Sequence, residues 1–188
     1  MIEKLLPVHA VPYHGPPDLL LRFRSVELFL CDVDGILTDG GVYMGGETEF
    51  KRFNIRDGFG LKLMQRSGIK VGWISHRPSP ATEQRAKDLG IDFLHQASSN
   101  KVDAIEDILD QTNLTWDEVC YMGDDIVDLG AIRRARLSAT VPGALKEVRM
   151  EAHYITRAQA GHGAVREVAE LILRAQNLWQ PLLDEYSI

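Results

Sequence analysis

Residues 26–40, VELFLCDVDGILTDG, decide the fold. The stretch begins as an apolar run interrupted only by Glu27, which predicts a buried strand over 26–31. The strand ends in Asp32 and Asp34, one residue apart, followed by Gly35. Burying an unpaired carboxylate is strongly unfavourable, so two acids at this place need a partner that offsets their charge. The stretch therefore predicts a first strand with a polar site at its carboxyl end.

Strand-like and helix-like segments alternate after this stretch, with short connections. The expected strands are 69–75, 91–95, 119–122, 137–141 and 154–156, and the expected helices are 18–25, 57–68, 79–90, 100–111, 125–135, 143–152 and 163–176. Such alternation is typical of a parallel sheet that is covered by helices on both faces. We predict an α/β fold, Rossmann-like, with three layers.

A β-hairpin is predicted over 41–54, because two strand-like segments flank Gly45-Gly46. Between the first acids and the strand 69–75 there is room only for this hairpin and one helix, so no cap domain is expected. We divide the chain into an irregular N-terminal arm (1–16), one domain (17–177) and a C-terminal tail (178–188). Trp179 in the tail is expected to be exposed in a monomer and to pack on a neighbouring subunit.

Composition limits the partners that this chain can have. Its 188 residues carry a net charge of −6, which argues against binding to nucleic acid, because that needs a basic face. Its two cysteines, Cys31 and Cys120, lie in apolar runs and are interpreted as buried thiols. No apolar run approaches the roughly 20 residues that span a membrane. We expect a cytoplasmic protein.

Four strand ends carry reactive side chains, and in an open parallel sheet such ends share one edge, where ligands bind. These residues are Asp32 and Asp34, Ser75, Lys101 just after 91–95, and Asp124 and Asp125. Clustered carboxylates favour a hard cation such as Mg²⁺. A hydroxyl and an ammonium suit phosphoryl oxygens. A carboxylate facing such a phosphate can attack it, and a second one can transfer the proton.

The motifs DVDGILTDG, Ser75, Lys101 and GDD occur in an order that resembles the haloacid dehalogenase superfamily of phosphohydrolases. The resemblance implies that Asp32 is the nucleophile and Asp34 the general acid/base, that Ser75 and Lys101 bind phosphate, and that Asp32, Asp34 and Asp124 hold Mg²⁺ with support from Asp125. A receiver domain uses similar residue types, but there the phosphorylated aspartate closes a later strand. Here that strand ends in Ser75, which disfavours the receiver interpretation.

Residues 18–188 resemble one capless subgroup, the 3-deoxy-D-manno-octulosonate 8-phosphate phosphatases, through YMGGETEFKRFNIRDGFG, QASSNK and AGHGAVREV. The resemblance implies a magnesium-dependent homotetramer that acts on a phosphorylated sugar acid in lipopolysaccharide precursor synthesis. In that family the hairpins form a central barrel, and the tail of one subunit can close a neighbour's site.

Arg77 favours the octulosonate substrate, because relatives that hydrolyse 2-keto-3-deoxynononate 9-phosphate carry glutamate at this place. Arg56 is a second candidate for substrate contact, with a hairpin salt bridge as the alternative. His76 stands where the family usually has glycine, which leaves open the nononate or another small sugar phosphate. An alcohol could also replace water as the final acceptor.

Overall fold

The computed structural model describes residues 17–46, 48–97 and 100–187, so the predicted arm 1–16 lies outside the described residues. In the described chain, a parallel sheet has the order β5-β4-β1-β6-β7-β8. Its strands are β1 (Leu28–Cys31), β4 (Lys70–Ile74), β5 (Phe93–His95), β6 (Val119–Met122), β7 (Leu137–Thr140) and β8 (Tyr154–Ile155). The strand predicted over 26–31 is thus shorter, and β1 occupies the centre of the sheet.

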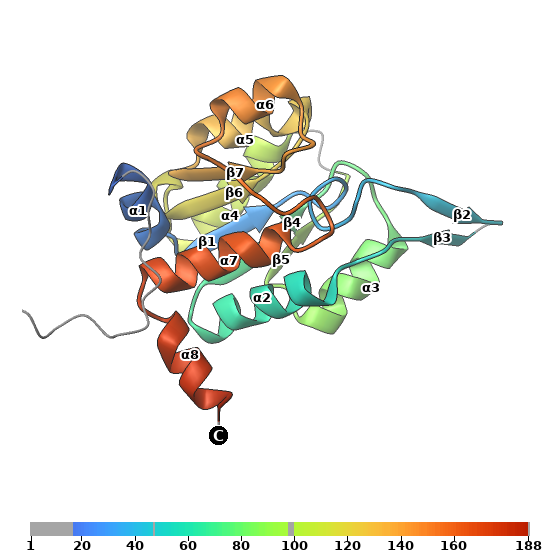
Figure 1. Cartoon of the computed structure of the whole chain (residues 1–188). Helices are drawn as coiled ribbons and strands as arrows, with labels where there is room; N and C mark the ends of the chain where they lie inside the picture. Colours follow the sequence, from blue (N-terminus) through green and yellow to red (C-terminus); the bar gives the residue numbers. More distant parts are fainter. Residues whose placement is uncertain (1–16, 47, 98–99, 188) are drawn as a thin grey trace, which may run out of the picture.

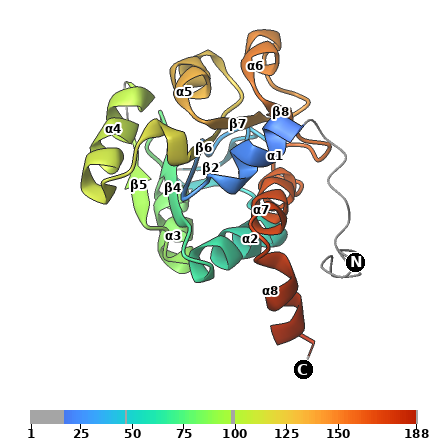
Figure 2. The same cartoon turned by 90° about the vertical axis from the view of Figure 1, so that its left-hand side faces the viewer.

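Helices cover both faces of this sheet, as Figures 1 and 2 show. One face carries α1 (Pro17–Arg24), α2 (Ile55–Arg66), α3 (Pro80–Leu89) and α7 (Ala164–Ala175); the other carries α4 (Lys101–Thr112), α5 (Leu129–Arg134) and α6 (Lys146–Glu151). The predicted helix 125–135 is divided into a 3-10 turn, η2 (Ile126–Asp128), and α5. The three-layer α/β prediction is confirmed, and no cap domain interrupts the described residues.

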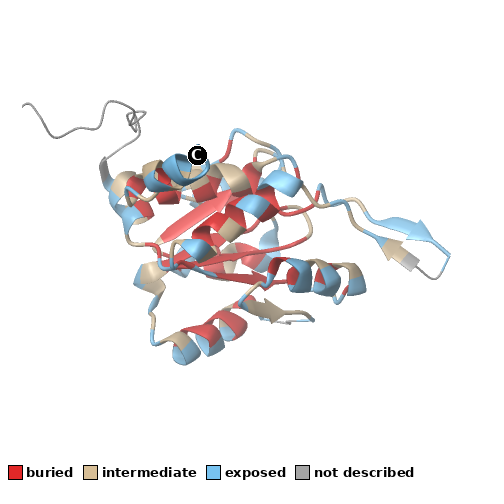
Figure 3. Cartoon of the chain, turned by 90° about the horizontal axis from the view of Figure 1, so that it is seen from below, coloured by how far each residue is buried: buried red, intermediate tan, exposed pale blue. Residues whose placement is uncertain are grey.

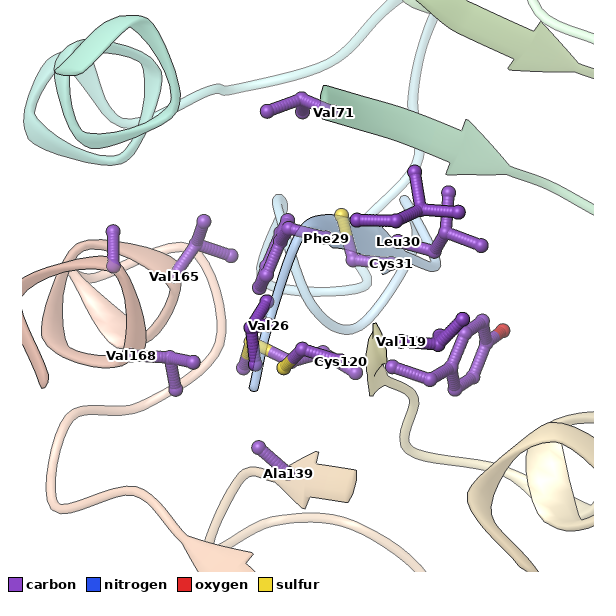
Figure 4. Packing of buried hydrophobic residues seen from close by; sticks show 14 of the residues in the cluster. Val26, Phe29, Leu30, Cys31, Val71, Val119, Cys120, Ala139, Val165 and Val168 are labelled. Atoms are coloured by element: carbon purple, nitrogen blue, oxygen red, sulfur yellow. The ribbon is translucent and has the colours of Figure 1, made fainter. Parts of the chain in front are cut away.

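The core lies between the sheet and its helices. Phe29 of β1 and Cys120 of β6 face Val165 and Val168 of α7, whereas Leu30 points to the opposite face (Figure 4). All five side chains are buried. The alternation of neighbouring residues between two apolar layers explains why the strand segments read as continuous apolar runs.

The helix ends carry standard caps. Ser79 caps α3 by accepting the amide of Thr82, and Gly90 ends that helix with a φ of 59°. Thr115 and Glu118 form a capping box at the 3-10 turn η1 (Trp116–Glu118).

Asp57 joins two helices that are far apart in the sequence. It lies in the first turn of α2, and its carboxylate accepts the amides of Gly163 (3.2 Å) and Arg166 (2.7 Å) at the start of α7. Burial raises the pKa of Asp57 despite these hydrogen bonds. The cap on α7 therefore comes from α2, since Gly163 at its N-cap has no side chain to supply one.

The predicted hairpin is present as β2 (Tyr43–Gly45) and β3 (Thr48–Phe50), which pair antiparallel and extend away from the body of the protein (Figures 1 and 3). Tyr43, Met44 and Phe50 are exposed, Met44 to 71%. The hairpin thus presents apolar side chains to solvent in a single chain.

The C-terminal segment differs from the expectation for Trp179. Residues Trp179–Glu185 form a helix, α8, and Trp179 is only 8% exposed. The guanidinium groups of Arg174 and Arg166 lie 4.8 and 5.2 Å from the centre of its ring. The prediction that Trp179 is exposed in a monomer is therefore wrong. None of the helices in the described chain is long and apolar enough to cross a membrane.

Candidate active site

Asp32 lies directly after the central strand β1 and is nearly buried. Its amide continues the sheet by donating to the carbonyl of Met122, and its Oδ1 accepts the amide of Val33 at 2.7 Å. Lys101 Nζ lies 3.0 Å from the same carboxylate. Burial raises the pKa of Asp32 to about 6, and the ammonium of Lys101 opposes that rise. The backbone therefore fixes this carboxylate at the edge of the sheet.

Asp124 follows β6 and faces the loop after β1. A Cβ on Gly35 would lie 2.2 Å from Asp124 Oδ2, and Gly35 has a φ of +87°, so only glycine fits there. Burial, together with the neighbouring carboxylates Asp128 and Asp32, raises the pKa of Asp124 to about 7. Its Oδ1 is buried without a hydrogen-bond partner in the described chain.

Asp128, which the sequence interpretation did not select, lies at the centre of this group and is fully buried. Its Oδ1 accepts from Lys101 Nζ (2.7 Å) and from the hydroxyl of Tyr121 (2.6 Å). Its Oδ2 accepts the amides of Asp124 (3.0 Å) and Asp125 (3.1 Å). The spacing of Asp125 and Asp128 is that of a capping box, which could have identified Asp128 from the sequence.

The arrangement fits a hard divalent cation. One carboxylate oxygen each from Asp32, Asp124 and Asp128 lies within 4.8 Å of the others. Three acids this close repel one another, which agrees with the raised pKa values of Asp32 and Asp124. The unpartnered Oδ1 of Asp124 and the all-oxygen donor set suit Mg²⁺.

Two predicted metal residues lie outside this cluster. Asp125 is exposed, and its side chain accepts the amide of Ile126 at the start of η2. The carboxylate of Asp34 turns toward the hairpin, where Lys51 Nζ lies 2.8 Å from Oδ1. Their side chains are therefore engaged elsewhere in the described chain.

The predicted phosphate ligands are both buried: Ser75 directly follows β4, and Lys101 begins α4. Ser75 Oγ donates to the carbonyl of Arg77 at 2.9 Å and accepts the amide of Arg77 at 3.3 Å. Burial opposes the charge on Lys101, but Asp128 and Asp32 outweigh it and raise the pKa of this ammonium. Lys101 is thus held as a cation.

The two arginines predicted to contact substrate have different surroundings. Arg77 Nη1 pairs with Glu49 of β3, and Arg77 Nε lies 3.7 Å from Asp34 Oδ2. Arg56 is exposed in the first turn of α2 and does not join the strand-end group in the described chain. Only Arg77 is brought to the predicted site.

A cavity of about 290 Å³ opens beside Asp124. Parts of four loops line it, including Gly35, Gly143 and His162. His162 is exposed, and its Nε2 lies 2.9 Å from Arg52 Nη2. Gly161, before it, has a φ of +64°, and a Cβ there would lie 2.7 Å from the amide nitrogen of Asp39. The loop before α7 therefore packs on the loop after β1 and forms one wall of the cavity.

Comparison with known proteins identifies the family. A model of haloacid dehalogenase-like hydrolases matches residues 91–168. The 3-deoxy-D-manno-octulosonate 8-phosphate phosphatase of Yersinia pestis is 40% identical over 167 residues, which cover 87% of this chain and 89% of the relative. The enzyme of that name from Escherichia coli K12 is 39% identical over 166 residues, with coverage of 87% and 88%.

Solved structures of phosphatases from this family have the same fold as this chain. The Yersinia pestis phosphatase superposes with a TM-score of 0.86 at 39% identity, covering 87% of this chain and 89% of that one. The Moraxella catarrhalis phosphatase, in complex with magnesium ion, phosphate ion and KDO molecule, gives a TM-score of 0.89 at 36% identity, with coverage of 92% and 99%. The chain belongs to the 3-deoxy-D-manno-octulosonate 8-phosphate phosphatase family of haloacid dehalogenase-like hydrolases.

Proposed function

We propose that this chain hydrolyses 3-deoxy-D-manno-octulosonate 8-phosphate to the free sugar acid and inorganic phosphate, as a step in lipopolysaccharide precursor synthesis. The observation that supports this most strongly is the position of Asp32, whose carboxylate lies at the carboxyl end of β1 with Lys101 Nζ 3.0 Å away. A relative of the same fold holds magnesium, phosphate and KDO.

In the proposed reaction, an oxygen of Asp32 forms a bond to phosphorus while the bond from phosphorus to the sugar oxygen breaks. Asp34 gives its proton to that oxygen and then takes a proton from the water that attacks the aspartyl phosphate. This second step releases inorganic phosphate and restores Asp32. Lys101 and Ser75 hold the phosphoryl oxygens by charge and by hydrogen bonding.

Asp32, Asp34 and Asp124 would hold Mg²⁺, with main-chain carbonyls and water completing its coordination and with Asp125 in support. When bound, the ion supplies positive charge that offsets the carboxylates and stabilises charge on the phosphoryl group. The residues of this chain then orient the phosphate toward Asp32.

Arg77 is the proposed partner of the sugar-acid carboxylate, because a guanidinium pairs well with that group. This role is supported by the position of Arg77, which pairs with Glu49 and lies 3.7 Å from Asp34, the proposed acid/base. We retain Arg56 as a second substrate contact, which requires it to act from the exposed start of α2. The nononate 9-phosphate alternative is not favoured, because the matched relatives are named as octulosonate phosphatases.

The proposed assembly is a cytoplasmic homotetramer built through the hairpins. The exposed side chains of Tyr43, Met44 and Phe50 support such a contact, since apolar groups gathered on one hairpin favour burial against another copy. Trp179 gives no such support, because it packs within its own chain. Light scattering that gives a monomer would contradict this assembly.

The decisive test compares phosphate release, with Mg²⁺ present, from the octulosonate 8-phosphate and the nononate 9-phosphate. The Asp32→Asn variant serves as the control. Preference for the octulosonate, lost in the variant, is the expected result. Cleavage of a generic phosphate ester through Asp32, with activity on neither sugar acid, would retain the chemistry and refute the substrate.

A further inference from the structure

Lys51 enters the site from the hairpin and has no role in the reaction described so far. It follows β3, and its side chain is 0% exposed. Its Nζ lies 2.8 Å from Oδ1 and 2.9 Å from Oδ2 of Asp34, and it donates to Thr82 Oγ1 of α3 at 3.2 Å. The ammonium therefore hydrogen-bonds Oδ2 of the proposed acid/base and lies beside Oδ1, which is buried without a hydrogen-bond partner in the described chain.

The contact between Lys51 and Asp34 is stabilised by the burial of the lysine. A lysine ammonium excluded from water is strongly unfavourable unless it is paired, and Asp34 is its partner here. Thr82 is fully buried and fixes the ammonium from the other side. The side chain of Asp34 stays 27% exposed, so its contact with Lys51 does not close it off from solvent.

Arg77 does not duplicate this role. It is the other cation near Asp34 in the described chain, but its Nε lies 3.7 Å away and its Nη1 pairs with Glu49. Without Lys51, the carboxyl group of Asp34 would be free to rotate toward Arg77. Displacement of a reacting group by about 1 Å can lower a rate on the order of 100-fold.

We propose that Lys51 is a positioning residue for proton transfer by Asp34, which makes the hairpin part of the catalytic apparatus. This inference rests on the proposed function, in which Asp34 protonates the departing sugar oxygen. As the phosphorus–oxygen bond breaks, the proton passes from Asp34 to that oxygen, and the resulting carboxylate stays fixed by the ammonium of Lys51. Lys51 keeps its own protons throughout.

A purely structural role for Lys51 makes a different prediction. If the lysine only attached the hairpin to α3, its loss would lower activity equally for every phosphate ester. If it positions Asp34, its loss should matter most where the leaving group needs a proton. An alkyl alkoxide needs one, whereas 4-nitrophenolate leaves without much assistance.

The experiment measures kcat/KM for the octulosonate 8-phosphate and for 4-nitrophenyl phosphate, with Mg²⁺ present. This parameter covers the steps through phosphorylation of Asp32, so the shared hydrolysis of the phosphoenzyme does not enter it. The variants are Lys51→Met and Asp34→Asn, with Lys70→Met as the matched control, because Lys70 is an exposed lysine at the opposite end of β4. Thermal unfolding checks that each variant is folded.

In Lys51→Met, we expect kcat/KM for the sugar phosphate, divided by kcat/KM for the aryl phosphate, to fall about 10- to 100-fold. It should fall at least as far in Asp34→Asn and stay unchanged in Lys70→Met. Equal losses on both esters in Lys51→Met, with discrimination in Asp34→Asn, would overturn the role of Lys51 alone. Absence of discrimination in Asp34→Asn would instead refute the acid/base role on which the inference rests.

Thr82→Val keeps the inference testable if Lys51→Met does not fold. This substitution preserves shape and the ion pair but removes the hydroxyl that fixes the ammonium. The same ratio should fall a few-fold, and an unchanged ratio would count against a positioning role.

Discussion

Asp128 holds Lys101 from beneath the site: its Oδ1 lies 2.7 Å from Lys101 Nζ, and both side chains are buried. The hydroxyl of Tyr121 takes the other position on Oδ1, and two main-chain amides occupy Oδ2. A carboxylate has about four acceptor positions, so those of Asp128 are fully used. A cation would therefore draw its carboxylate oxygens from Asp32 and Asp124.

The Asp128→Asn substitution should lower the free energy of unfolding by about 3–5 kcal/mol, because it leaves a buried ammonium without one of its two counter-ions. It should also raise KM for the phosphate ester, since Lys101 loses its orientation. Urea denaturation and steady-state kinetics measure the two effects. Asp110→Asn, an exposed change on α4, should alter neither. Stability equal to that of the wild type would show that Asp32 alone can hold Lys101.

In the metal-free protein, the titration of Asp124 should lower the free energy of unfolding as the pH rises from about 4 to about 7. Its folded pKa of about 7 lies above the ordinary value of an aspartate, so the folded state binds more protons than the unfolded state within this interval. The free energy of unfolding therefore falls as pH increases. Asp32, with a folded pKa of about 6, acts in the same direction.

Asp124→Asn removes this titration. With a chelator present, the variant should be more stable than the wild type between about pH 5 and about pH 8. Added Mg²⁺ should stabilise the wild type more than the variant. Urea denaturation at each pH, with and without the metal, measures both. Parallel curves for the two proteins would contradict the raised pKa of Asp124.

Arg77→Ala should lower kcat/KM for the octulosonate 8-phosphate about 10- to 100-fold, the range expected for one charge-assisted hydrogen bond. The loss on 4-nitrophenyl phosphate, which has no carboxylate, should be much smaller. Equal losses would indicate that Arg77 instead supports the loop of Ser75, to which its main chain is hydrogen-bonded.

Trp179→Ala should reduce the free energy of unfolding by about 3 kcal/mol, because it empties a large buried site between α7 and α8. Thermal or urea unfolding measures the loss. Tyr186→Phe, a small change at an exposed residue of the C-terminal segment, serves as the control. Phosphatase activity well below the unfolding temperature should be retained. An unchanged stability would show that the ring contributes little.

The fold and the strand-end residues were predictable because they depend on local patterns. Apolar runs, Ser79 and Gly90 mark their elements without reference to distant segments, and strand ends in a parallel sheet meet at one edge. Ser75, Lys101 and Asp124 are therefore placed by topology alone.

The interactions that were missed depend on packing. Asp128 looked like an ordinary helix residue, and only the close approach of β6, η2 and α4 gives it four donors. Lys51 lies within the predicted hairpin, and nothing local indicates that its side chain reaches Thr82 on α3. Trp179 was misjudged because its cover consists of Arg166 and Arg174, whose flat guanidinium groups shield an aromatic ring.

The central place of β1 has a consequence for synthesis on the ribosome. β1 and β4 emerge early and can pair, but the other edge of β1 finds its partner only when Val119–Met122 have been made. Until then this edge exposes unpaired amides beside the apolar side chains of 28–31, a combination prone to aggregation. Nascent chains that stop before residue 119 should therefore be the ones that most need a chaperone.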